Sequence, residues 1–101
     1  MKEIKLAVNG KEYIKNRFTG RDWLRMLDYT EAAGNNPVSR EFFDARYDVV
    51  SDMMNVPREE LEKAELEEVT RIFKEIEREI TAAFFGITPK EVEEVLETPR
   101  A

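Results

Sequence analysis

Apolar and polar residues alternate at the start of the chain. Every second residue from Ile4 to Val8 is apolar, and a second short segment follows over residues 11–15, with Tyr13 and Ile14 at its centre. The Asn9-Gly10 pair between these runs is typical of a type I′ hairpin turn, because both residues readily accept positive φ angles. We therefore predict a β-hairpin over residues 1–17. Two strands alone are marginally stable, so we expect the apolar face of the hairpin to pack on helices.

After the hairpin, the apolar residues follow helical spacing. Thr19 is a good N-cap, since its hydroxyl accepts a backbone N–H while the Asp22 carboxylate accepts the N–H of Thr19 in return. Phe18 and Trp23 stand on either side of this cap at the positions of a hydrophobic staple, so we interpret Trp23 as a core residue. The first helix is expected to end at Gly34.

Three further helical segments follow the first. Ser39 is placed to cap a second helix with a broad apolar face, and Pro57 stops that helix because proline disfavours helical backbone at the preceding residue. The pattern from Pro57 to Phe85 is helical, with an irregularity near Lys63–Glu65, and Gly86 ends it. The apolar stripe of this segment is Leu66, Val69, Phe73, Ile76, Ile80 and Ala83.

The last helix is expected near Glu91–Glu97, with Thr88 as its cap and Pro99 as its stop. The chain is long enough for one small domain, residues 1–101. The predicted fold class is α+β, mainly α. A hairpin is followed by about four helices in the helical part, residues 19–97.

Composition narrows the chemistry. Histidine and cysteine are absent from the 101 residues. Without them the chain has no disulfide, no thiolate nucleophile, no imidazole base and none of the usual zinc ligands. Catalysis would have to rest on carboxylates, lysine, tyrosine or hydroxyls. We expect a protein that is not an enzyme, with no catalytic residues, no metal site and no cofactor.

Charge is unevenly distributed along the chain. The net charge is −6, but residues 1–40 hold 8 basic and 5 acidic residues, giving +3, while residues 41–101 hold 8 and 17, giving −9. The acidic half opposes nucleic-acid binding, which needs a dominant basic face. The longest apolar run, Ala82–Phe85, is too short for a membrane span. We expect a cytoplasmic protein that binds neither nucleic acid nor membrane.

Carboxylates recur at helical spacing, and they leave two other functions open. One stripe of the second helix carries acidic residues at i, i+4 and i+8, namely Asp44, Asp48 and Asp52. This stripe is either a polar outer face or a docking surface for a basic partner. The latter would suit an acidic regulator or DNA mimic. The pairs spaced i, i+3 would suit a magnesium-dependent enzyme, although solvated helix faces explain them more simply. These pairs are Glu41-x-x-Asp44, Glu59-x-x-Glu62 and Glu65-x-x-Glu68.

Two apolar pairs are the hardest to bury. Adjacent residues on a helix point about 100° apart, so both members of Met53-Met54 or of Phe84-Phe85 rarely face one core. Core packing remains the simpler interpretation. The alternative is a partner-binding surface formed by Met53, Met54, Phe84 and Phe85, because exposed methionine and aromatic clusters mark adaptable interfaces.

The order of these features resembles one protein family, through the hairpin and the acidic helical remainder. The segments that carry the resemblance are residues 4–13, the run Phe18-Thr19-Gly20-Arg21-Asp22, and residues 56–61, 66–69 and 73–76. They are similar to the tail assembly chaperones of long-tailed phages and prophages of Gram-positive bacteria.

The resemblance implies a non-enzymatic role in phage tail morphogenesis, in the cytoplasm of the bacterial host. Such a chaperone holds the tape-measure protein in solution and helps recruit tail-tube subunits. The implied partners are therefore the tape-measure protein and the tail-tube protein. The sequence leaves formation of a homo-oligomer open.

Overall fold

The predicted fold class is confirmed. The computed structural model describes residues 2–97, with side chains described as far as Glu94. In chain order the elements are β1 (Ile4–Val8), β2 (Lys11–Lys15), α1 (Gly20–Ala33), α2 (Arg40–Met54), α3 (Arg58–Lys63), α4 (Leu66–Phe85) and α5 (Pro89–Glu97). The predicted stop at Pro99 lies outside the described residues.

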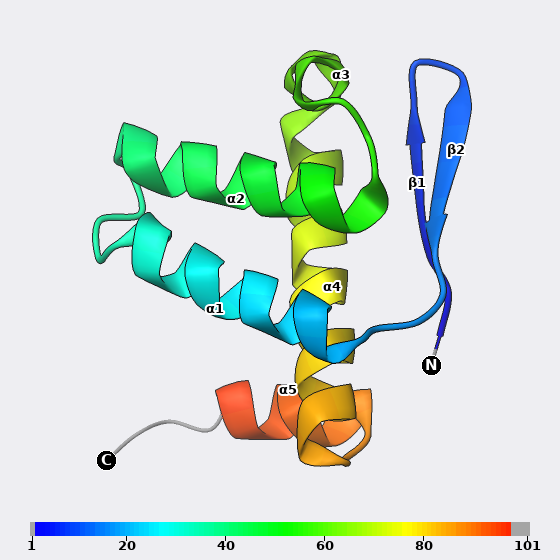
Figure 1. The fold of residues 1–101 in the computed structure, drawn as a ribbon, viewed down its shortest axis with the longest axis vertical. Helices are drawn as coiled ribbons and strands as arrows, with labels where there is room; N and C mark the ends of the chain where they lie inside the picture. The colour runs from blue at the N-terminus through cyan, green and yellow to red at the C-terminus, as the bar shows by residue number, and fades with distance from the viewer. Residues whose placement is uncertain (1, 98–101) are drawn as a thin grey trace.

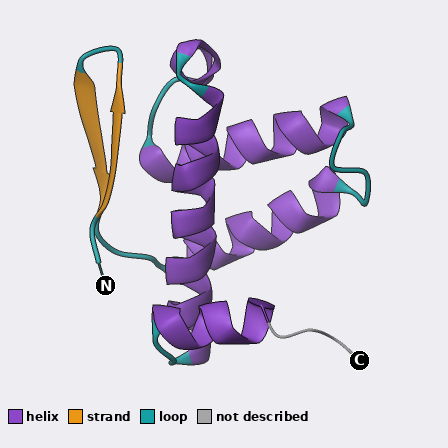
Figure 2. Ribbon diagram, turned by 180° about the vertical axis from the view of Figure 1, so that it is seen from behind, coloured by secondary structure: helices purple, strands orange, loops and turns teal. Residues whose placement is uncertain are grey.

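The helices form two layers (Figures 1 and 2). Helices α1 and α2 run antiparallel as one layer, and α4 crosses behind both of them. The hairpin stands at one side of this assembly, with β1 against α4 and β2 against α2. Helix α5 folds back across the end of α4, and α3 lies beside the end of α2. Every element therefore packs against α2 or α4.

The hairpin has the predicted turn. Asn9 and Gly10 have φ angles of 51° and 80°, the left-handed values that a type I′ turn needs. Val8 pairs with Lys11, and the antiparallel register continues to the pair Ile4 and Lys15. The inward face of β1, residues Ile4, Leu6 and Val8, is buried as predicted.

Local hydrogen bonds fix the helix starts where the sequence predicts them. The Thr19 hydroxyl accepts the N–H of Asp22 at 3.4 Å, and the Asp22 carboxylate accepts the N–H of Thr19 at 2.9 Å. Ser39 caps α2 through the N–H of Phe42. A second reciprocal capping box joins Thr88 and Glu91 at the start of α5. These caps satisfy amides that a helix leaves unpaired at its first turn.

The described residues contain five helices, where the sequence predicts about four. The irregularity near Lys63–Glu65 is a complete break, because Ala64 and Glu65 both have extended ψ angles, 160° and 132°. The break lets the short helix α3 turn Leu61 into the core independently of α4. Within α4 the middle of the predicted stripe is buried, but its ends, Leu66 and Ala83, are exposed.

One core unites the hairpin and the first four helices, with Val49, Val50, Leu61, Val69, Ile72 and Ile76 fully buried. Helix α5 is attached by buried Val92 and by an ion pair between Arg78 and Glu93 at 2.6 Å. Among residues 2–97, no helix combines the length and the apolar character needed to cross a bilayer.

Candidate protein-binding surface

Three aromatic side chains meet at the surface where the start of α1 lies against the end of α4. Trp23 is half-buried and packs against the core, whereas Phe84 and Phe85 are exposed. The Trp23 and Phe84 rings are stacked, with centroids 4.1 Å apart and planes 8° from parallel. Phe85 meets both rings edge-on, at 6.4 Å from Trp23 and 5.1 Å from Phe84. Phe84 and Phe85 remain 56% and 63% exposed. We call Trp23, Phe84 and Phe85 the aromatic cluster.

Backbone signals hold this cluster in place. The capping box at Thr19 fixes the first turn of α1, which carries Trp23. Helix α4 ends directly after Phe85 because Gly86 adopts a left-handed φ of 68°. The N–H groups of Gly86 and Ile87 both bond the Ala82 carbonyl, which closes the last turn. Both phenylalanines are thus held on a terminated helix rather than on a loop.

A shallow hollow lies beside the cluster. It has a volume of about 270 Å³ and is lined by Phe18, Thr19, Gly20, Trp23, Ile80, Ala83 and Phe84. Most of these side chains are apolar, and none is charged. Phe18 and Trp23 share this hollow, in keeping with the predicted staple. An apolar side chain of a partner would find aromatic and aliphatic walls here.

The two methionines are not part of this surface. Met53 and Met54 are 4% and 2% exposed and belong to the core. For this pair the simpler interpretation, core packing, holds, and the alternative of a partner-binding surface does not. The end of α2 is enclosed on several sides, because α1, α3, α4 and β2 all contact this helix. In this fold only Phe84 and Phe85, of the four predicted residues, are accessible to a partner.

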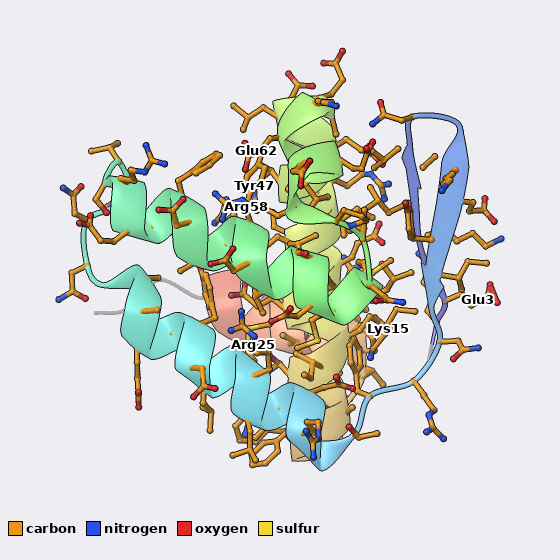
Figure 3. All side chains as sticks on the ribbon, turned by 45° about the horizontal axis from the view of Figure 1, so that its top comes forward. Glu3, Lys15, Arg25, Tyr47, Arg58 and Glu62 are labelled. Atoms are coloured by element: carbon orange, nitrogen blue, oxygen red, sulfur yellow. The ribbon has the colours of Figure 1, made fainter. Side chains whose placement is uncertain are left out.

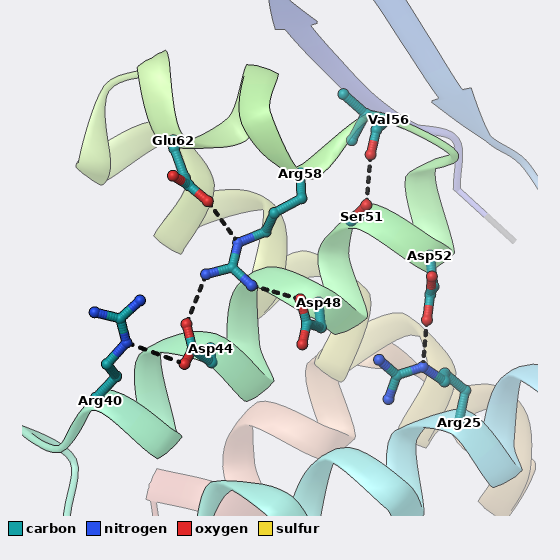
Figure 4. Close-up of polar contacts among 9 residues, drawn as sticks. All are labelled: Arg25, Arg40, Asp44, Asp48, Ser51, Asp52, Val56, Arg58 and Glu62. Atoms are coloured by element: carbon teal, nitrogen blue, oxygen red, sulfur yellow. Dashed lines mark hydrogen bonds and ion pairs between the residues drawn. The ribbon is translucent and has the colours of Figure 1, made fainter.

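The acidic stripe of α2 is largely neutralised within the protein (Figure 4). Arg58, at the start of α3, donates hydrogen bonds to Asp44 at 2.7 Å and to Asp48 at 2.6 Å. It also forms an ion pair with Glu62 at 3.0 Å. The hydrogen bond from Arg58 holds the pKa of Asp44 below its usual range, and the same bond raises the pKa of Arg58. Arg58, Tyr47 and Glu62 gather where α2 meets α3 (Figure 3).

The third aspartate of the stripe is paired with α1. Arg25 donates to Asp52 at 2.6 Å and lies between α1 and α2 (Figures 3 and 4). All three aspartates therefore bind an arginine of the same chain. This pairing removes most of the repulsion along the stripe and leaves little unpaired charge for a basic partner.

The carboxylate pairs do not converge. Glu62 is bound by Arg58, and Glu68 by Arg71, which lowers the pKa of Glu68. Among the side chains that the structure describes, no group of three or more acidic residues is placed to hold a metal ion. The spacing i, i+3 by itself places only two carboxylates one turn apart on a single helix.

One buried and two half-buried charged residues were not singled out in the sequence. Glu79 is 4% exposed, and its carboxylate accepts the backbone N–H of Lys2 at 3.2 Å. The Arg46 guanidinium lies over the Phe73 ring at 4.4 Å and the Phe42 ring at 5.1 Å. Partial burial raises the pKa of Glu77. Glu79 lies three residues after Ile76 and so continues the buried face of α4. This helical spacing is the feature of the sequence from which the burial of Glu79 could have been predicted.

Comparison of the chain with family models, with curated proteins and with solved structures finds no match.

Proposed function

We propose that this chain is a non-enzymatic tail assembly chaperone that binds the tape-measure protein of a phage or prophage. In this role it acts in the cytoplasm of the bacterial host and helps recruit tail-tube subunits. The observation that carries the proposal is the aromatic cluster, because two large phenylalanine side chains stay more than half exposed beside an apolar hollow. Exposed apolar patches of this kind mark binding surfaces.

The chemistry of the cluster fits an apolar helical client. Tape-measure proteins are long, and their apolar helical stripes would aggregate before a tail forms. Phe84 and Phe85 can cover such a stripe while the hollow beside Trp23 receives one client side chain, as in helix-in-groove recognition. The net charge of −6 keeps chaperone and client complexes apart in solution.

The alternative of an acidic regulator or DNA mimic has less support. Such a protein needs a free, regularly spaced negative surface, whereas Asp44, Asp48 and Asp52 are bound by Arg58 and Arg25. The magnesium-enzyme alternative likewise lacks a converging set of carboxylates in the described residues. Binding through apolar contacts is the function that these residues support best.

Co-expression with a tape-measure protein from the same genome tests the proposal. We expect the tape-measure protein to become soluble and to co-purify with the chain in moderate salt, because apolar contacts are not screened. Substituting both Phe84→Ser and Phe85→Ser should abolish co-purification. Leu66→Ser is the matched control, since Leu66 is 64% exposed at the opposite end of α4. A client that stays insoluble with the wild-type chain would refute the proposal.

A further inference from the structure

The outward face of α1 carries an unpartnered apolar seam. Gly20, Leu24, Leu27 and Glu31 are spaced by four, three and four residues, so they lie on one side of the helix. All four are exposed, and the two leucines keep 63% and 44% of their surface accessible. The opposite side of α1, with Met26, Tyr29 and Ala33, already packs on the core. The seam is therefore a second helix face with no role in the fold.

Charged residues follow this seam in a particular order. Arg21 and Asp28 line the same hollow as Leu24, which is about 390 Å³ in volume. Both charged residues therefore lie along one flank of the apolar seam. Arg21 stands near the start of α1 and Glu31 near its end. Among the described residues, Arg21, Asp28 and Glu31 have no ion-pair partner, unlike Arg25 in the same helix, which binds Asp52.

We propose that two copies of this chain associate through antiparallel packing of their α1 helices around a two-fold axis. The axis passes between Leu24 and Leu27, so that Leu24 of each copy packs on Leu27 of the other. About one helical turn away from the leucine pair, Arg21 of each copy faces Glu31 of the other. Gly20 has no side chain, so the two helices can approach closely at this point. A two-fold axis repeats every contact twice, which makes the leucine pair and the ion pair self-complementary.

Charge favours a second copy as the occupant. The positive residue lies at one end of the seam and the negative residues lie toward the other, and an antiparallel copy reverses this order. Such a two-helix contact is small, so we expect weak and reversible association.

The proposed interface leaves the aromatic cluster accessible. Trp23 lies on the core side of Leu24 and Leu27, next to Phe84 rather than on the seam. A dimer would place two aromatic clusters at the edges of one interface. The dimer contact involves α1 alone and does not require the proposed client.

Sedimentation equilibrium from about 10 μM to 1 mM tests the dimer. The wild-type mass should rise from 11.9 kDa toward twice that value. Leu24→Glu should weaken association about tenfold or more, because it buries a charge in the seam. Leu66→Glu, a substitution at a leucine of equal exposure on α4, should leave association unchanged. A wild-type chain that stays monomeric, or equal effects of the two substitutions, would overturn the proposal.

Charge reversal tests the antiparallel register. Arg21→Glu alone and Glu31→Arg alone each place like charges opposite one another twice, and each should weaken the dimer about tenfold. Arg21→Glu places a negative charge near the N-terminus of α1, and Glu31→Arg places a positive charge near its C-terminus; the helix dipole favours both. The monomer should therefore keep its fold, which circular dichroism checks. The double variant R21E/E31R should recover wild-type association. Failure of this recovery would refute the proposed register.

Discussion

Replacing Met54 by alanine tests whether Met54 belongs to the core rather than to a partner-binding surface. The side chain is 2% exposed, so truncation leaves a cavity beneath α2. Buried methionine-to-alanine changes cost about 2–5 kcal/mol. In a domain of this size each kcal/mol lowers the melting temperature by about 4–8 °C. We therefore expect Met54→Ala to lower the midpoint of thermal unfolding, followed by far-UV circular dichroism, by at least about 8 °C.

The matched surface variant is Phe85→Ala. Phe85 is 63% exposed, and its loss should cost less than about 1 kcal/mol, mainly from its edge contacts with neighbouring rings. Met54→Leu controls for volume and should cost less than about 1.5 kcal/mol. Urea unfolding of the same variants gives the free energy directly. If Met54→Ala left stability unchanged while Phe85→Ala lowered it by several kcal/mol, the assignment of core and surface would be wrong.

Three further variants test local features of the fold by urea unfolding. Gly86→Ala should cost about 1–2 kcal/mol, because an alanine at φ 68° is strained and the helix end at Phe85 depends on it. Thr19→Ala should cost about 0.5–2 kcal/mol of stability by removing the hydroxyl of the capping box. Thr19→Ser keeps a hydroxyl at this position, so it should retain most of that stability. Glu77→Gln should raise stability at pH 7. The raised pKa means that the charged form of Glu77 opposes folding above that pKa, so the gain should vanish as the pH falls below the ordinary pKa of glutamate; a constant gain would contradict this reasoning.

Features set by neighbouring residues could be predicted from the sequence. The turn at Asn9-Gly10, the caps at Thr19 and Ser39 and the end at Gly86 depend on residues within one helical turn or one hairpin loop. Their geometry is local, and the structure has each where it was expected. The break at Ala64 was visible only as an irregularity, because no proline or glycine marks it.

Features set by distant residues could not be predicted in the same way. Met53 and Met54 are both buried because several elements surround the end of α2. Helical spacing shows which residues share a face, but it does not show how many other elements pack around the helix. Arg58 reaches Asp44 across 14 positions, and nothing in its local sequence separates it from the other basic residues. The stack of Phe84 on Trp23 likewise joins the end of α4 to the start of α1, two segments far apart in the sequence.

The proposed function requires that the aromatic cluster binds an apolar client. Trp23 is the only tryptophan of the chain and is stacked on Phe84, so its fluorescence reports on the proposed site directly. Titration with a fragment of the tape-measure protein that lacks tryptophan should shift the Trp23 emission to the blue, with similar affinity in about 0.1 M and 0.5 M salt. No emission change on adding the fragment, or binding that disappears in the higher salt, would contradict the claim.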